Sequence, residues 1–432
     1  MRYCLKNVKI INKNATFHQQ NKNIWIENGY ITHIENPQEA LQKPTADDKV
    51  IEATKVDEAY CVSIGWFDMC ANFQDPGQES KETLRSGLQT AMQAGFTEVC
   101  LQPNTNPVVQ TKSDIAYLTQ YNASHLTTLH PIAAITQQTN GKDLNDMIDL
   151  YHAGAVAFSD GNKTLWNTDL LLKTLQYLQP LNALLIQKPN DALLSQFGLM
   201  NEGIVSTQLG MKGIPHLAEE ICISRDIDIL RYVGGKLHFN TISSSKSLKQ
   251  IKAAQEEGLA VTCDVAAHQL CLDDSFLASF DTRFKVFPPL RTQNDIKSLW
   301  EGLEKGIIGV VVSDHQPQDE ESKQVEFDMA EFGASTLDTT FAALYTYSQQ
   351  YNVSLTTCIE AITSQPRSIL SLPIPTIEVG AKANLTVFSP KKEWVVTPEV
   401  LVSNSKHNPF LRQTLQGKAI ACFNNKQAYL AQ

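Results

Sequence analysis

Residues 61–102, CVSIGWFDMCANFQDPGQESKETLRSGLQTAMQAGFTEVCLQ, contain the repeating unit that decides the fold. An apolar run at residues 61–68 is followed by an amphipathic segment at residues 81–95, in which apolar residues recur three or four positions apart. This segment ends in Gly95, a residue typical of the end of a helix, and a second apolar run follows at residues 96–102. The stretch therefore predicts a strand, a helix and a second strand in succession.

The same alternation of short apolar runs and amphipathic segments continues to about residue 374. About eight such strand–helix units predict a (β/α)8 barrel. At both ends of the chain the pattern changes to short alternating strands with turn signals such as Asn28-Gly29. We expect an α/β protein with a (β/α)8 TIM-type barrel at residues 61–375 and a small β-sandwich domain built from residues 1–60 and 376–432.

The composition is that of an ordinary globular protein. Of the 432 residues, 42% are hydrophobic and 19% are charged, and the formal net charge is −10. Because acidic and basic residues are spread along the whole chain, we expect no nucleic-acid partner and no binding to an anionic membrane. The chain has no run of about 18 apolar residues and no signal-peptide core at its N-terminus, so we expect no membrane span. The nine cysteines are scattered without a C-x-x-C pair, which is typical of buried thiols and predicts a cytoplasmic protein.

Seven stretches together resemble one known family. They are DPGQESKETLRSGLQTAMQAGFTEV (75–99), QPNTNP (102–107), GAVAFSDG (154–161), GIPHLAEEICISRDI (213–227), KVFPPLRTQND (285–295), SDHQP (313–317) and GAKANLTVFSP (380–390). In this order and spacing the chain resembles, over almost its whole length, dihydroorotase of the bacterial class that works beside aspartate transcarbamoylase, within the amidohydrolase superfamily. The resemblance implies a metal at the carboxyl ends of the barrel strands, a bridging hydroxide, a carboxylate that moves its proton, and anchors for the substrate carboxylate.

The resemblance also implies which positions hold the metal, and most of them are changed. The six positions are Cys70, Asn72, Asp160, Gln187, Thr241 and Asp314. Cys70 and Asn72 stand where the family has its His-x-His pair, and two further histidines are replaced by Gln187 and Thr241. The two aspartates are retained, with Asp314 at the position of the general base. Since zinc sites of this kind depend on neutral imidazoles and an amide is a poor zinc ligand, we expect no metal cofactor.

The implied substrate anchors are changed in the same way. Gln74, Gln318 and Phe287 replace the family's arginine, histidine and asparagine, and only Asn104 is retained. Loss of the arginine and the histidine removes the charged donors that hold a carboxylate. The substitutions therefore predict the loss of catalysis and retention of the fold.

The retained residues can also be explained by structural roles, which agree with a loss of catalysis. Asp160 and Asp314 are expected to accept backbone N–H bonds at strand ends, and Asn104 and Arg291 to order their loops. Cys70 could act as a nucleophile in place of a metal-bound hydroxide, but an ordinary buried thiol is favoured because no histidine is placed beside it by a motif. The acidic stretch at residues 318–333 is expected to be a solvated surface loop.

Three functional hypotheses follow. The leading one is an inactive dihydroorotase-like protein of pyrimidine biosynthesis that acts as a structural partner of aspartate transcarbamoylase, as a homo-oligomer, or as both. The second is an active dihydroorotase or another cyclic-amide hydrolase with an altered site, for which zinc would be the cofactor. The third is a binding protein that uses the barrel mouth as a neutral pocket lined by Gln74, Gln187, Thr241 and Phe287. Metal content after purification without chelators distinguishes the first two hypotheses, and thermal shifts with uncharged ligands test the third.

Overall fold

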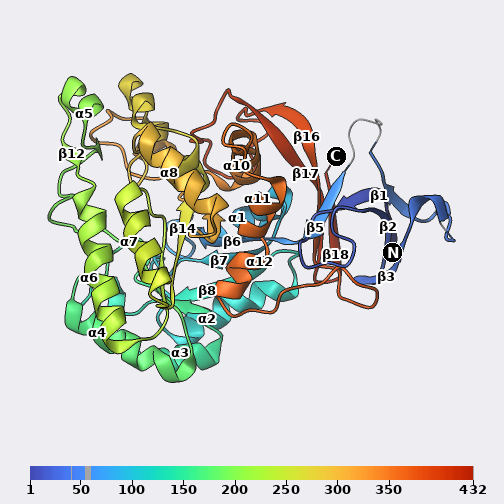
Figure 1. Ribbon diagram of the computed structural model, residues 1–432, viewed down its shortest axis with the longest axis horizontal. Helices are drawn as coiled ribbons and strands as arrows, with labels where there is room; N and C mark the ends of the chain where they lie inside the picture. Colours follow the sequence, from blue (N-terminus) through green and yellow to red (C-terminus); the bar gives the residue numbers. More distant parts are fainter. Residues whose placement is uncertain (40, 54–59, 432) are drawn as a thin grey trace.

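The computed structural model describes residues 1–39, 41–53 and 60–431. Eight parallel strands form a sheet in the order β15-β14-β13-β10-β9-β8-β7-β6 (Figure 1). They are β6 (Trp66–Ala71), β7 (Phe96–Leu101), β8 (Thr128–Ala133), β9 (Ala157–Phe158), β10 (Leu185–Gln187), β13 (Leu237–Phe239), β14 (Val261–Ala266) and β15 (Val310–Val312). The two ends of this sheet meet where Ala71 forms a parallel bridge with His315 and Asn72 N–H donates to the His315 carbonyl oxygen at 2.8 Å. The strands thus make a nearly closed barrel.

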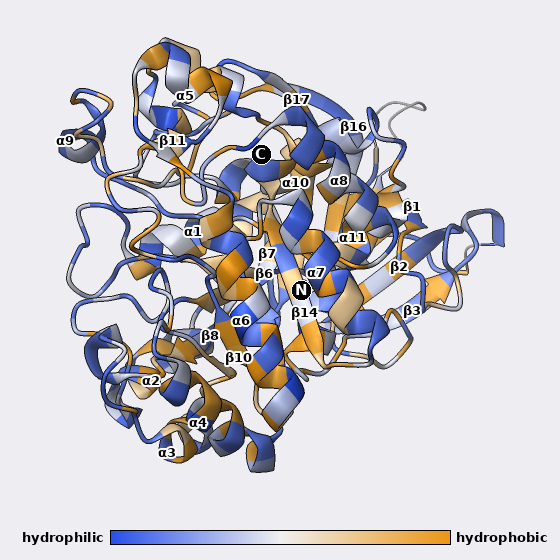
Figure 2. Ribbon diagram, turned by 60° about the vertical axis from the view of Figure 1, so that its left-hand side comes forward, coloured by the Kyte–Doolittle hydropathy of each residue, from blue (hydrophilic) through white to orange (hydrophobic). Residues whose placement is uncertain are grey.

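Most helices surround the barrel strands. In chain order the helices are α1 (Leu84–Ala94), α2 (Lys112–Thr119), α3 (Met147–Ala153), α4 (Thr168–Leu178), α5 (Ile204–Leu209), α6 (Leu217–Val233), α7 (Ser245–Glu256), α8 (Gln293–Glu304), α9 (Glu320–Lys323), α10 (Thr340–Ser348), α11 (Leu355–Ala361) and α12 (Ser364–Ile369). Of these, α5 and α9 lie in loops at the edge of the molecule (Figure 2). Figure 2 shows that α6 and α7 carry apolar and polar residues in alternation, as expected for helices with one face against a core.

The first of these helices ends at Gly95, where the sequence predicts, and begins at Leu84, slightly later than the predicted segment at residues 81–95. Thr83 and Ser86 form a capping box, in which each side chain accepts a hydrogen bond from the other residue's backbone N–H at 3.0 Å. Gly95 ends the helix in the left-handed region, at a φ of 104°, which costs a glycine little because it has no Cβ. The chain then enters β7 directly.

Strands from both ends of the chain form a second sheet, to the right of the barrel in Figure 1. Its order is β18-β17-β16-β5-β1-β2-β3, and β4 also pairs with β1. The bounds are β1 (Arg2–Ile10), β2 (Asn21–Glu27), β3 (Tyr30–Glu35), β4 (Lys49–Ile51), β5 (Cys61–Ile64), β16 (Leu385–Val395), β17 (Thr414–Asn424) and β18 (Gln427–Leu430). The predicted fold class, a TIM-type barrel with a small β-domain from both termini, is confirmed. Residues 61–64, which the sequence places at the start of the barrel, pair with β1 and β16 and so belong to the small sheet.

Trp66 joins the two parts of the molecule. Its side chain is fully buried, and its ring contacts those of Phe96, Phe341 and Phe388 at centroid distances of 5.8, 4.3 and 5.4 Å. Phe96 belongs to the barrel and Phe388 to β16 of the small sheet, so one aromatic cluster fixes their relative position.

A short pair of parallel strands, β11 (Met200–Asn201) and β12 (Gly213–Ile214), flanks α5 between β10 and α6. No helix among the described residues combines the length and apolar character needed to cross a membrane.

Candidate functional site at the barrel mouth

The positions that the resemblance assigns to the metal lie at or just beyond the carboxyl ends of the barrel strands, and all are buried. The exposed fractions are 1% for Cys70, 2% for Asn72, 2% for Asp160, 1% for Gln187, 1% for Thr241 and 4% for Asp314. In a barrel this end carries the functional residues, because the following loops converge there. The contacts of each side chain show what the altered residues do.

Asp314 is paired with a lysine. The Lys188 ammonium nitrogen lies 3.5 Å from Asp314 Oδ1, and the two side chains are 4% and 3% exposed. The Lys188 ammonium also faces the Phe287 ring at 5.9 Å from its centroid. Within the described part of the chain, the Asp314 carboxylate accepts no backbone N–H bond of the kind predicted, and its partner is a buried cation from the end of the fifth strand.

Cys70 completes this buried cluster as a neutral thiol. Its Sγ lies 3.7 Å from Asp314 Oδ1 and 3.6 Å from Asn240 Oδ1, and it accepts a hydrogen bond from Gln102 Nε2 at 3.5 Å. Burial, together with the charge of Asp314, raises the pKa of the Cys70 thiol well above its usual value. A thiol in this state is a poor nucleophile, which agrees with the buried-thiol interpretation of the sequence.

Gln187 and Asp160 are engaged by neighbouring backbone and side chains. Gln187 donates to Asp226 Oδ2 at 3.1 Å and to the Leu165 carbonyl at 3.2 Å, and it accepts from Leu165 N–H at 3.0 Å. Asp160 accepts from Thr136 N–H at 2.9 Å and from the Thr136 hydroxyl at 2.6 Å. Burial raises the pKa of the Asp160 carboxyl. The bond to a backbone N–H predicted for Asp160 is present, whereas Gln187 is not brought to Asp314.

Thr241 is held by a buried carboxylate. Its N–H donates to Asp264 Oδ1 at 2.5 Å, and Asp264 Oδ2 lies 2.9 Å from His238 Nε2. The backbone at Thr241, at Gln74 and at Asp314 has a positive φ of 52°, 58° and 46° respectively. Such conformations cost energy in residues other than glycine and cluster at functional sites. Three residues at the mouth therefore have unfavourable backbone conformations that their surroundings hold in place.

The anchor positions bind other parts of the protein. Gln74 Nε2 donates to the Pro317 carbonyl at 2.8 Å, and Gln318 Nε2 donates to the Phe332 carbonyl at 2.7 Å. The Phe287 ring contacts that of Phe332 edge-on at a centroid distance of 5.7 Å. The polar groups of Gln74 and Gln318 are thus engaged within the protein, and Phe287 is engaged by a ring contact.

Asn104 and Arg291 behave as loop-ordering residues. Asn104 Nδ2 donates to Asn72 Oδ1 at 2.8 Å, and Asn72 Nδ2 donates to the His315 carbonyl at 3.3 Å. Arg291 is buried, and its guanidinium donates to Ser243 Oγ at 3.0 Å and to Asn201 Oδ1 at 2.9 Å. Both residues therefore tie loops together at the mouth.

The stretch at residues 318–333 exposes most of its acidic side chains, as its charges predict, but it is anchored to the barrel by buried residues. Lys323 and Phe327 are buried, and the Lys323 ammonium donates to the Thr282 carbonyl at 2.9 Å. Lys285, also buried, donates to the carbonyls of Phe327 and Asp328 at 2.7 and 3.0 Å. Backbone carbonyls that accept from lysines allow this polar segment to pack against the barrel.

Sequence reasoning missed two charged or titratable residues of the mouth, Lys188 and His268. Neither nitrogen of the His268 ring has a hydrogen-bond partner among the described residues, and the residue is 2% exposed. Burial lowers the pKa of His268 to about 4, with opposing effects of Asp314 and Lys188. The signal for Lys188 is a charged residue directly after a buried strand, whereas no motif marks His268.

Comparisons with known proteins agree with this architecture. A dihydro-orotase-like family profile matches residues 61–247, and an amidohydrolase family profile matches residues 202–414. The chain is 35% identical over 422 residues to a protein named dihydroorotase from Syntrophus aciditrophicus, with 97% of each chain covered. The chain belongs to the dihydroorotase family of the amidohydrolase superfamily. A second family member, from Pelotomaculum thermopropionicum and also named dihydroorotase, is 36% identical, with 86% of this chain and 87% of that protein covered.

Solved structures show the same fold at lower sequence identity. L-hydantoinase (dihydropyrimidinase) from Arthrobacter aurescens superposes with a TM-score of 0.84 at 19% identity, over 99% of this chain and 95% of that chain. Dihydropyrimidinase from Brevibacillus agri gives a TM-score of 0.83 at 19% identity, over 100% and 95% of the two chains.

The zinc that a dihydroorotase fold implies does not fit the residues of this mouth. Three of the six positions carry an amide or a hydroxyl, and the two carboxylates are engaged by Lys188 and Thr136. Among residues 1–39, 41–53 and 60–431, no group of three or more His, Cys, Asp or Glu side chains is arranged to hold a metal ion. The Lys188 ammonium is a donor without a lone pair, so it balances the charge of Asp314 but binds no metal.

Proposed function

We propose that this member of the dihydroorotase family does not hydrolyse dihydroorotate, and that it supports pyrimidine biosynthesis as a structural partner of aspartate transcarbamoylase. One observation carries the catalytic part of the proposal, namely the buried Lys188–Asp314 ion pair at the position of the general base. The Lys188 ammonium, 3.5 Å from Asp314 Oδ1, occupies the carboxylate that the family resemblance assigns as the general base.

Hydrolysis of a cyclic amide by this fold requires an activated water and a stabilised oxyanion. The imidazoles that bring a metal to the strand ends are replaced. The Cys70 thiol offers no substitute, because burial raises its pKa and its neighbours are an acid and two amides. Gln74 and Gln318 are bonded to backbone carbonyls, so these two anchor positions offer no charged donor for a substrate carboxylate, and the Lys188 ammonium is paired with Asp314.

The same contacts support a structural role. Most altered side chains of the mouth, among them Gln74, Gln187 and Gln318, donate to acceptors within the protein, although the Thr241 hydroxyl has no hydrogen-bond partner among the described residues. The family resemblance supplies the partner, because dihydroorotase homologues of this bacterial class, active or not, can assemble with aspartate transcarbamoylase. Assembly would use loops and outer faces, which do not depend on the altered residues. Self-association is the second mode of assembly that we expect.

Two measurements on one preparation test the catalytic part. Zinc per chain is measured on protein purified without chelators, and dihydroorotate turnover is measured with added zinc. The Syntrophus aciditrophicus relative, prepared in parallel, serves as the control. We expect near-zero zinc and no turnover for this protein. Binding of one or two metals per chain together with turnover would overturn the proposal, and would point to a site that includes Cys70, Asp160 and Asp314.

The partnership is tested separately with aspartate transcarbamoylase from the same organism. We expect the two proteins to co-elute in size-exclusion chromatography with light scattering, at a mass above either component alone. We also expect the transcarbamoylase to change its oligomeric state or its activity on addition of this protein. Independent elution with unchanged transcarbamoylase activity would rule out the partnership while leaving the catalytic result unaffected.

A further inference from the structure

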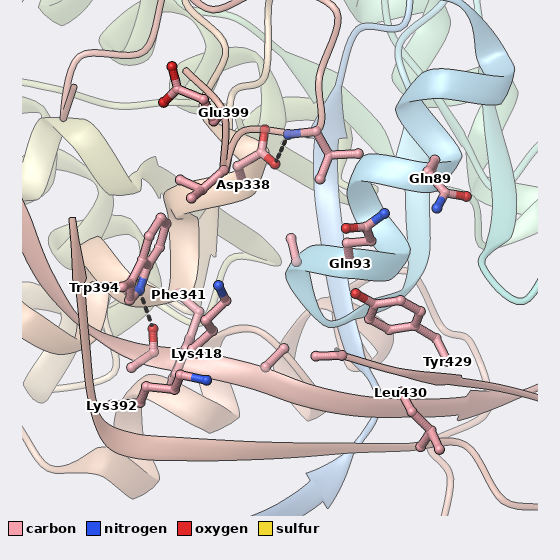
Figure 3. Close-up of a pocket in the computed structure, with 17 residues that line it drawn as sticks. Gln89, Gln93, Asp338, Phe341, Lys392, Trp394, Glu399, Lys418, Tyr429 and Leu430 are labelled. Atoms are coloured by element: carbon pink, nitrogen blue, oxygen red, sulfur yellow. Dashed lines mark hydrogen bonds between the residues drawn. The ribbon is translucent and has the colours of Figure 1, made fainter. Parts of the chain in front are cut away.

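A cavity of about 550 Å³ lies away from the barrel mouth, between the barrel and the β16–β17 hairpin (Figure 3). Its wall comes from α1, from the start of α10, from both hairpin strands and from the end of β18. None of the metal or anchor positions discussed above lines it. Its volume is that of a site for a small molecule, which usually occupies about 300–1,000 Å³.

Two lysines face this cavity without a counter-ion. Lys392 is exposed and Lys418 is half-buried, and neither forms an ion pair or a side-chain hydrogen bond with any residue that the structure describes. Burial and the nearby charge of Lys392 lower the pKa of Lys418. In a chain with a net charge of −10, two unpaired cations in one concavity form a local site for an anion.

The wall beside the lysines offers an aromatic surface. The Lys418 ammonium lies 5.2 Å from the centroid of the Trp394 ring, and Trp394 Nε1 donates to the Gly417 carbonyl at 3.0 Å. This hydrogen bond fixes the indole against the hairpin. Phe341, which stacks on Tyr345 at a centroid distance of 5.9 Å, forms part of the floor. A planar or apolar group can therefore lie next to the cations.

Three neutral side chains in the wall are available for hydrogen bonds. Gln89 and Gln93 of α1 and Tyr429 of β18 line the cavity, and their polar groups have no side-chain partner among the described residues. Figure 3 shows the Tyr429 hydroxyl on the Gln93 side of the cavity, with the ammonium groups of Lys392 and Lys418 nearer the hairpin.

The carboxylates of the wall do not neutralise the lysines. Asp338 accepts hydrogen bonds from the backbone N–H groups of Val402 and Ser403 at 2.9 and 3.4 Å. Glu399 is exposed, and in Figure 3 both carboxylates lie at the end of the cavity away from Lys392 and Lys418. The cavity thus has a cationic end and an acidic end.

We propose that this cavity binds a small organic anion. The phosphate or carboxylate group lies between Lys392 and Lys418, the planar body lies against Trp394, and Gln93 and Tyr429 hydrogen-bond its polar atoms. This site is separate from the barrel mouth and does not depend on the function proposed above. Because its wall combines barrel helices with the hairpin, an occupant also links the two parts of the molecule and raises the unfolding temperature.

Calorimetric titration of the full chain with phenyl phosphate, benzoate and inorganic phosphate tests the proposal. We expect saturable binding of phenyl phosphate or benzoate with a Kd below about 1 mM, and weaker binding of inorganic phosphate because it lacks the ring. Binding should weaken at higher ionic strength, since two exposed or half-exposed cations carry it. Preference for phenyl phosphate over benzoate identifies a phosphorylated occupant, and the reverse identifies a carboxylate.

Variants of the two lysines test whether the probes bind in this cavity. Lys392→Met combined with Lys418→Met should weaken the better probe at least tenfold, whereas Lys391→Met, an exposed lysine outside the wall, should leave it unchanged. If the double variant does not fold, as judged by circular dichroism, Tyr429→Phe is used and should weaken binding about threefold or more. The proposal is overturned if none of the three probes saturates the wild-type protein, or if the folded lysine variant binds as the wild type does.

Discussion

Replacement of Lys188 by methionine should destabilise the barrel strongly. The substitution removes the ammonium group and keeps most of the side-chain volume, so it leaves the Asp314 carboxylate buried without its cation. At 3.5 Å and an effective dielectric constant of about 20, the Coulomb energy of the pair is about 5 kcal/mol. Removal of one partner of a buried pair typically costs about 3–5 kcal/mol, and we expect a loss of that size in the free energy of unfolding.

Removing the charge of Asp314 as well should recover most of the stability that Lys188→Met loses. Asp314→Asn suits the site, because asparagine tolerates the positive φ of 46° at this position. In the variant that combines Lys188→Met with Asp314→Asn no unpaired charge is buried, so we expect a stability within about 1–2 kcal/mol of the wild type. Asp314→Asn alone leaves Lys188 without its counter-ion and should also destabilise the protein, so the coupling energy from the double-mutant cycle should exceed about 2 kcal/mol in magnitude.

Guanidinium unfolding followed by tryptophan fluorescence measures these differences, since Trp66 and Trp300 are both buried. Lys173→Met is the matched control, because the Lys173–Asp169 pair is more than half exposed and should contribute less than about 0.5 kcal/mol. The reasoning is refuted if the free energy of unfolding of Lys188→Met lies within about 1 kcal/mol of the wild-type value, because a loss that small is typical of a solvent-exposed ion pair.

Three further expectations follow from other buried groups. Burial and the neighbouring Lys285 lower the pKa of Lys323 from 10.5 to about 7. Above pH 7 the unfolded chain therefore binds more protons than the folded chain. The free energy of unfolding should rise with pH by up to about 1.4 kcal/mol per pH unit. Urea unfolding between pH 7.5 and 8.5 should show a flatter dependence of the free energy of unfolding on pH for Lys323→Met than for the wild type. Lys297→Met, at an exposed position, should keep the wild-type slope. Equal slopes in the wild type and both variants would contradict the burial argument. All nine cysteines are buried and free. A thiol reagent should therefore react with almost none of them in the native protein and with all nine after denaturation. Rapid labelling of Cys70 in the native protein would show that its thiol is accessible. Trp66→Ala should lower the free energy of unfolding by about 3–5 kcal/mol, because the ring fills the junction between barrel and small sheet, and a loss below 1 kcal/mol would mean that the junction repacks.

The sequence by itself determined the architecture and, through the family resemblance, the prediction that the metal-ligand positions are changed. Hydrophobic periodicity and helix-end signals are local properties of the chain, so the strand–helix units and the strands at both termini could be recognised without any contact information. The identity of a ligand is also local, because His-x-His at one strand is either present or replaced by Cys70 and Asn72. The assignment of residues 61–64 to a sheet was not local, since an apolar strand pairs equally well with either sheet until its neighbours are known.

Only the tertiary structure decided how the altered residues are used. Lys188 and Asp314 are far apart in the chain and meet because their strands end on the same rim of the barrel. Adjacent residues on a strand point to opposite sides, so Lys188 reaches Asp314 whereas Gln187 turns to Asp226. The acidic side chains of residues 318–333 are mostly exposed, as their charges predict, whereas Lys323 is buried because the Thr282 carbonyl, from a distant segment, accepts its ammonium group. Lys392 and Lys418 likewise become a pair only when two hairpin strands place them over the same cavity, because charge proximity is a property of the fold.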